Sequence, residues 1–167
     1  MAEAFLRWEA ARRGLGIQVR STGTHAWSGR AATIEGRRVM ADHGVPLDDH
    51  RTLELDQRLV EWADLLIGMS REHARDVVRA FPEAAGRTYT MKAFLELLPS
   101  LPPYEDTESW LQEAARLSDS FSPPADQDID DPIGERQEAY RRVAAEIRDL
   151  TKAFADGLEG KRVCLQA

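Results

Sequence analysis

The first residues of the chain carry the clearest chemical signal, an amphipathic helix that begins at once at Met1. Ala4, Phe5 and Trp8 follow helical spacing, and the glycine at position 14 ends the pattern. The free N–H groups and the positive dipole at the start of a helix attract anions. In an α/β protein such a helix normally follows a strand and a phosphate-binding loop. The pattern therefore indicates part of a phosphate site whose central loop would precede residue 1.

The sequence contains no complete metal-binding motif. Alternating aspartates over residues 126–130 resemble a calcium loop, but the positions that require Gly and Glu hold Asp131 and Gln137. The histidines do not stand at metal-ligand spacing. We therefore expect no metal and no cofactor.

Composition narrows the class of protein. With 167 residues we expect a single domain over 1–167, ending in a flexible tail over 158–167. A net charge of −7 argues against nucleic-acid binding, which needs a basic face. The longest apolar run, residues 65–69, is too short to cross a membrane. The single cysteine, Cys164, excludes a disulfide framework and favours the cytoplasm.

Helical and strand-like stretches alternate along the chain, which predicts an α/β fold with a parallel sheet between helices. In the second helix, Ile34, Val39 and Met40 are expected to face inward. In the last helix, the expected apolar face consists of Tyr140, Val143, Ile147 and Leu150. We expect strands over 17–21, 64–69 and 87–90, the second of them buried on both faces. We expect helices over 2–13, 31–42, 56–61, 70–80, 91–98, 110–117 and 136–154.

Four stretches, in this order, resemble the low-molecular-weight protein-tyrosine-phosphatase family in its bacterial form. They are Ser-Thr-Gly-Thr-His-Ala-Trp-Ser-Gly over 21–29, the stretches over 42–51 and 63–73, and Asp131-Pro132 before the last helix. The family typically reads Arg-Ser-Pro-Met-Ala-Glu-Ala at the start of its first helix, and this chain begins at that Met. The resemblance implies a three-layer α/β/α fold of the phosphotyrosine phosphatase I type.

The resemblance also implies a chemistry. Such enzymes hydrolyse phosphate monoesters, above all phosphotyrosine, without a metal, through a cysteine thiolate in a Cys-x5-Arg loop. Asp131 would be the general acid, and Trp27 would stack on the substrate ring. Glu3, Ser21 and His50 would support the phosphate loop by hydrogen bonds. The expected partner is a phosphotyrosine protein or a small phosphate monoester. Ile133 follows Asp-Pro where the family often has an aromatic residue, which leaves the preference for tyrosine open.

The sequence lacks the catalytic loop of the family pattern. Its one cysteine, Cys164, has only three residues after it and cannot start a Cys-x5-Arg loop. As written, the chain lacks the nucleophile, the phosphate-binding arginine and the first strand. We interpret this as a start codon assigned too late, with roughly fifteen to twenty residues missing if strands run to about five or six residues. The chain as written is then expected to be inactive.

Two other functions stay open. An arsenate reductase of the same fold would use extra cysteines, and only Cys164 is present. A pseudophosphatase acting by protein interaction would have its true N-terminus at Met1. The sequence does not set the oligomeric state.

Overall fold

The first helix, α1 (Ala2–Arg13), begins at the second residue, as the apolar spacing predicts. Phe5, Leu6 and Ala10 are buried along one of its faces. Gly14 ends the helix with a φ of 61°, in the left-handed region that favours glycine, and its N–H reaches the carbonyl of Ala11.

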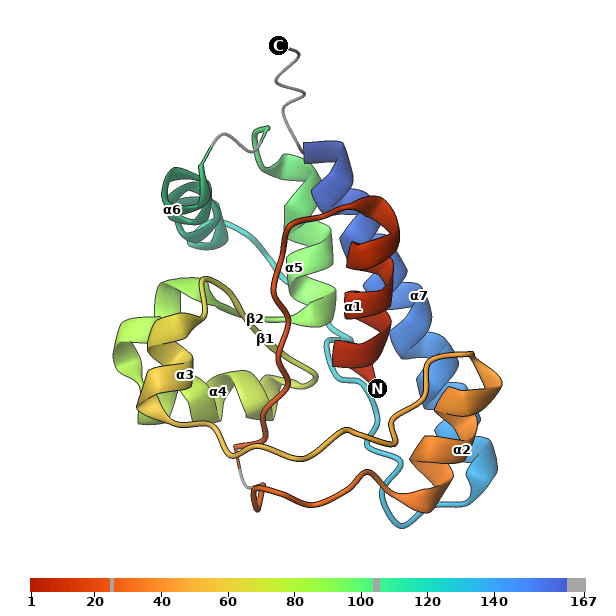
Figure 1. Ribbon diagram of the computed structural model, residues 1–167. Coiled ribbons are helices and arrows are strands. Elements are labelled where there is room, and N and C mark those ends of the chain that lie inside the picture. Colours follow the sequence, from red (N-terminus) through yellow and green to blue (C-terminus); the bar gives the residue numbers. More distant parts are fainter. Residues whose placement is uncertain (25, 104–105, 162–167) are drawn as a thin grey trace. The chain divides into compact units, whose positions relative to one another are not determined.

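The computed structural model describes residues 1–24, 26–103 and 106–161, and the chain divides into two compact units (Figure 1). Unit 1 comprises Met1–Leu55 and Ile129–Ala155. Unit 2 comprises Asp56–Asp128 and Asp156–Ala167. Of the residues weighed above, those at positions 25 and 164 lie outside the described ranges.

The second helix of unit 1, α2 (Ile34–Asp42), starts three residues later than the sequence suggests. Thr33 sets this start, because its hydroxyl accepts a hydrogen bond from the N–H of Gly36 at 3.1 Å. Val39 and Met40 are buried as expected. The expectation for Ile34 is wrong, since at the first turn its side chain points to solvent and stays 54% exposed.

The last helix, α7 (Gln137–Lys161), runs further than the expected end at residue 154. Tyr140, Val143 and Ile147 are buried on one face, as their spacing predicts, and Leu150 on the same expected face is half-buried. A Cβ at Gly36 would meet the Tyr140 ring of α7 at 3.7 Å, an ordinary van der Waals contact, and the capping hydroxyl of Thr33 more tightly, at 3.0 Å. Residues 158–161 of the expected tail are helical, and 162–167 lie outside the described residues.

Residues 17–21 do not form the expected strand. The stretch has no regular secondary structure and pairs in no ladder, and Ile17 is 40% exposed. Alternating side chains produce a strand only where a neighbouring strand satisfies the backbone groups. In the described residues of unit 1, such pairing is limited to single bridges, Gly23 with Glu54 and Ala31 with Arg51.

Unit 2 contains two short parallel strands, β1 (Leu66–Gly68) and β2 (Thr88–Thr90), with Ile67 opposite Tyr89. The crossover between them runs through α4 (Arg71–Ala80) and the 3₁₀ helix η1 (Pro82–Arg87). Both strands are shorter than expected. β1 is half-buried rather than buried on both faces, because in the described chain the sheet has two strands.

The helices of unit 2 begin at capping side chains. Asp56, Ser70, Thr90 and Asp106 each accept a hydrogen bond from the N–H three residues on. The ring of Phe94, fully buried, lies 5.2 Å from that of Tyr89. The remaining elements are α3 (Gln57–Trp62), α5 (Met91–Leu97), η2 (Leu98–Ser100) and α6 (Thr107–Ser118).

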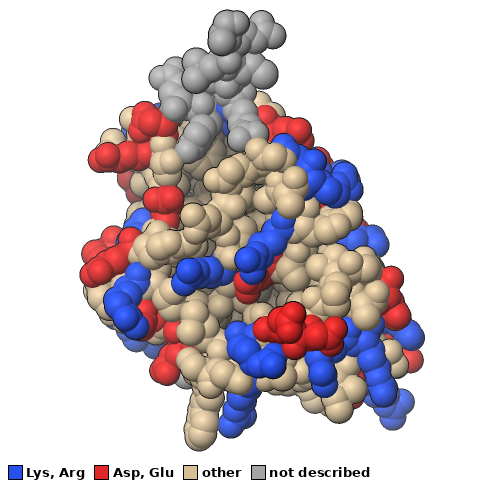
Figure 2. Space-filling view, viewed as in Figure 1, with Lys and Arg blue, Asp and Glu red and all other residues tan. Residues whose placement is uncertain are grey.

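The strands of unit 2 lie between α4 and α5 (Figure 1), so the fold is α/β, with a small parallel sheet and helices on both faces. None of the described helices is both long and apolar enough to cross a membrane. Acidic and basic side chains are interspersed on the face seen in Figure 2.

Candidate active site

The carboxylate of Glu3, in the first turn of α1, lies close to the two other residues expected to support a phosphate loop, Ser21 and His50. Its Oε2 accepts hydrogen bonds from the N–H of Ser21 at 3.1 Å and from the Ser21 hydroxyl at 2.5 Å. The same oxygen lies 3.7 Å from Nδ1 of His50. Oε1 accepts a hydrogen bond from Arg7 at 3.0 Å. Three separate stretches of unit 1 thus meet at one carboxylate, and we call Glu3, Ser21 and His50 the Glu3 cluster.

A cavity of about 960 Å³ opens beside the Glu3 cluster, and all its lining residues belong to unit 1. They come from α1, from residues 14–21, and from residues 46–51 with Leu53. Arg7, Arg20 and Arg51 are among them, together with two aspartates. Guanidinium groups and the N–H groups at the start of α1 bind anions, so the cavity offers donors for a phosphoryl group. In the described ranges, no three His, Cys, Asp or Glu side chains come together as metal ligands.

Trp27 lies in unit 1 but does not line this cavity. Its side chain is 73% exposed, and it borders a separate hollow of about 600 Å³. The loop is held by Thr52, whose hydroxyl donates to the Trp27 carbonyl and accepts from the N–H of Arg30. The structure therefore does not bring Trp27 together with the Glu3 cluster.

Asp131 stands in a turn just before α7. Its Oδ1 accepts a hydrogen bond from the N–H of Ile133 at 3.0 Å, and the residue is exposed. The preceding Asp130 pairs with Arg142 at 3.0 Å. Within the described residues, no hydrogen bond or ion pair links Asp131 to the Glu3 cluster or to Trp27.

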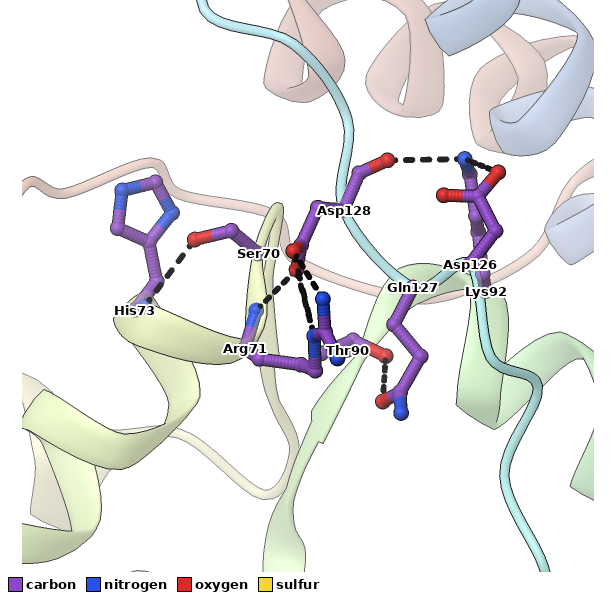
Figure 3. Close-up of polar contacts among 8 residues, drawn as sticks. All are labelled: Ser70, Arg71, His73, Thr90, Lys92, Asp126, Gln127 and Asp128. Carbon is purple, nitrogen blue, oxygen red and sulfur yellow. Dashed lines mark hydrogen bonds and ion pairs between the residues drawn. The ribbon is translucent and has the colours of Figure 1, made fainter.

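In unit 2, Asp128 forms a bidentate ion pair with Arg71 (Figure 3). The Arg71 guanidinium donates to Oδ2 through Nη2 at 2.8 Å and through Nε at 3.2 Å, and the Arg71 N–H donates to Oδ1 at 2.7 Å. The Arg71 side chain, followed by its backbone N–H, lowers the pKa of Asp128 to about 2. Asp128 is thereby held at the N-terminus of α4.

The residues around Asp128 are fixed to β2 and α5 (Figure 3). The Lys92 ammonium donates to the carbonyl of Asp128 at 2.9 Å and to Asp126 at 3.0 Å. Thr90 and Gln127 share a hydrogen bond of 3.0 Å. Sequence reasoning missed this network. The alternating aspartates were its only signal there, and nothing local indicates that Asp128 pairs with an arginine 57 positions away.

Comparison with known proteins places these findings in a family. A protein-arginine-phosphatase of Geobacillus stearothermophilus is 26% identical over 144 residues, which cover 86% of this chain and 78% of the relative. The low molecular weight protein-tyrosine-phosphatase Etp of Escherichia coli K12 is 30% identical over 93 residues, covering 56% of this chain and 63% of the relative.

The solved structure of the YwlE arginine phosphatase from Geobacillus stearothermophilus superposes on this chain with a TM-score of 0.72. The two are 25% identical, and the superposition covers 95% of this chain and 83% of the other. The family model for low molecular weight phosphotyrosine protein phosphatases matches residues 1–115. Because that match spans more than half of the sequence, this chain belongs to the low molecular weight phosphotyrosine protein phosphatase family.

Proposed function

We propose that this chain supplies the general acid and the loop-supporting residues of a cysteine-dependent protein phosphatase that hydrolyses phosphate monoesters. The observation that carries the proposal is the Glu3 cluster, which borders a cavity that runs along α1 from Met1 to Gly14. There the carboxylate would fix a phosphate loop while the helix dipole favours the phosphoryl anion. Its setting is the cytoplasm, on the argument from the single cysteine.

The reaction proceeds in two steps. A cysteine thiolate attacks phosphorus, the bond to the leaving oxygen breaks, and Asp131 gives that oxygen a proton. Water then attacks the phosphocysteine and gives a proton back to the Asp131 carboxylate, while the bond between sulfur and phosphorus breaks and releases inorganic phosphate and the thiolate. Asp131 suits this role because Oδ1 is fixed by the Ile133 N–H, while the carboxylate faces solvent. Trp27 would contact the substrate beyond its phosphate.

The nucleophile is the part that residues 1–167 do not contain, since the sequence has no Cys-x5-Arg. We propose that a segment ahead of Met1 supplies this loop in the complete gene product. The 167 residues alone are then inactive.

Replacing Asp131 tests the assignment of the acid. In the complete enzyme, Asp131→Asn should lower kcat by about 10²- to 10⁴-fold, the usual contribution of a general acid. The basic limb of the pH–rate profile should disappear as well. Asp130→Asn is the matched control and should keep both the parent kcat and the basic limb of the pH–rate profile. An unchanged basic limb in Asp131→Asn would contradict the acid role.

Phosphoarginine is a second candidate substrate, favoured because the similarity to the arginine phosphatase covers 86% of this chain, against 56% for the tyrosine phosphatase. The ratio of kcat/KM for matched phosphotyrosine and phosphoarginine peptides decides between them. A much higher kcat/KM for the phosphotyrosine peptide supports phosphotyrosine as the substrate. A much higher kcat/KM for the phosphoarginine peptide supports phosphoarginine.

A further inference from the structure

The indole of Trp27 already carries a cation on its face. The guanidinium carbon of Arg30 lies 4.8 Å from the ring centroid, within the range of a cation–π contact. The ring is nevertheless 73% exposed. The surface of Trp27 is therefore both open to solvent and suited to a guanidinium group.

An acidic residue, Glu54, borders the same hollow as Trp27. Glu54 and Trp27 border the hollow of about 600 Å³, with Thr24, Ala26 and Ser28 completing its lining. Glu54 is exposed, and in the described part of the chain its carboxylate enters neither a hydrogen bond nor an ion pair. One hollow is thus bordered by an acidic residue and an aromatic residue, the two residue types that bind a planar cation.

Hydrogen bonds hold together the two backbone segments that carry Trp27 and Glu54. The N–H of Glu54 donates to the Ser28 hydroxyl at 2.9 Å. On either side of Glu54, the N–H of Gly23 donates to the Leu53 carbonyl at 2.9 Å, and the N–H of Leu55 donates to the Gly23 carbonyl at 3.2 Å. The hollow is therefore built by two segments cross-linked at several points.

We propose that Trp27 and Glu54 form a subsite for an arginine side chain of a protein ligand, and that Arg30 competes for the same ring within the free chain. The incoming guanidinium stacks on the indole and pairs with the Glu54 carboxylate, while Arg30 moves off into solvent. The assignment rests on the proposed function only in taking the bound protein as the substrate.

The chain contains an internal control for this subsite. Trp8 also has a guanidinium over its ring, that of Arg12 at 4.5 Å, and is 43% exposed. Trp8 does not line the hollow of Trp27 and Glu54. A guanidinium that binds non-specifically to exposed indoles would contact both Trp8 and Trp27.

Binding is measured by NMR on the 167-residue protein, using the indole N–H signals assigned by Trp27→Leu and Trp8→Leu. The probe is the peptide acetyl-Gly-Gly-Arg-Gly-Gly-amide. Its uncharged match carries citrulline in place of arginine. The arginine peptide should shift the Trp27 signal saturably and leave that of Trp8 unchanged, and the citrulline peptide should shift neither. Equal effects of the two peptides, or equal shifts of the two tryptophans, would overturn the proposal.

Two variants should move the affinity in opposite directions. Glu54→Gln should weaken binding of the arginine peptide by about two- to fivefold, as for an exposed ion pair. Arg30→Gln should strengthen it by about two- to fivefold, because an exposed cation–π competitor is lost. Glu135→Gln, an exposed carboxylate outside the hollow, is the control and should change nothing. Weakening by both Glu54→Gln and Arg30→Gln would overturn the proposal. The readout needs no catalysis, so a failure of the phosphatase proposal leaves it interpretable.

Discussion

The carboxylates of Glu3 and Asp128 each accept several hydrogen bonds, but in different surroundings. The Glu3 side chain is 16% exposed and lies on a cavity, where it joins a hydroxyl, an imidazole and a guanidinium. The Asp128 side chain is 44% exposed and is held by one arginine, itself 48% exposed. Burial makes a polar group costly to leave unpaired, whereas water readily replaces an exposed partner. The first arrangement therefore shapes a site, and the second fixes a surface loop.

The largest stability effect is expected in the Glu3 cluster. Glu3→Gln removes the charge and one of the acceptor oxygens, which should lower the free energy of unfolding by about 2 kcal/mol, the scale of hydrogen bonds to a charged group. Urea unfolding followed by circular dichroism measures the change. Glu135→Gln, at an exposed position of the same unit, should stay close to the parent protein. A Glu3→Gln protein as stable as this control would contradict the greater contribution to stability expected of Glu3 than of Asp128.

A smaller, pH-dependent effect is expected at Asp128. Its pKa is lowered to about 2, so the ion pair stabilises the folded protein fully above the ordinary pKa of 3.8. That stabilisation is lost as the pH falls through about 2. Arg71→Gln should raise the pKa of Asp128 toward 3.8 and lower stability near neutral pH only slightly.

Carbon-13 NMR titration of the Asp128 carboxyl, between pH 5 and the lowest pH at which the fold persists, gives the direct readout. Arg79→Gln, which removes the exposed partner of Asp76, is the matched control and should leave the Asp128 titration unchanged. A midpoint for Asp128 near 3.8 in the parent protein would contradict the account of this loop.

Local patterns in the sequence predicted the helices well. The apolar spacing and Gly14 gave the bounds of α1, and Ser70 marked the start of α4 through its capping bond. Residues 17–21 show where such patterns fail, since alternation describes a strand but cannot supply the neighbour that pairs with it. The predicted start of α2 at residue 31 was wrong, because the capping hydrogen bond of Thr33 sets the first turn at Ile34.

Some residues of the candidate site were predicted from the sequence, and some contacts in the structure were not. Glu3, Ser21 and His50 came from the family resemblance, and the structure brings these residues together. Their role in supporting a phosphate loop stays a prediction. The pairing of Arg71 with Asp128 could not be foreseen, because it joins residues far apart in the sequence and depends on how the loop after α6 returns to α4.

We propose that this chain completes a cysteine-dependent phosphatase whose nucleophile lies ahead of Met1. The most direct test is the mass of the N-terminal peptide of the protein isolated from its own cells. We expect a peptide that extends upstream of Met1 and contains Cys, five residues and Arg, followed by Ser-Pro. A native protein that begins at Met1 would contradict the claim, because no residue could then act as the nucleophile by this mechanism.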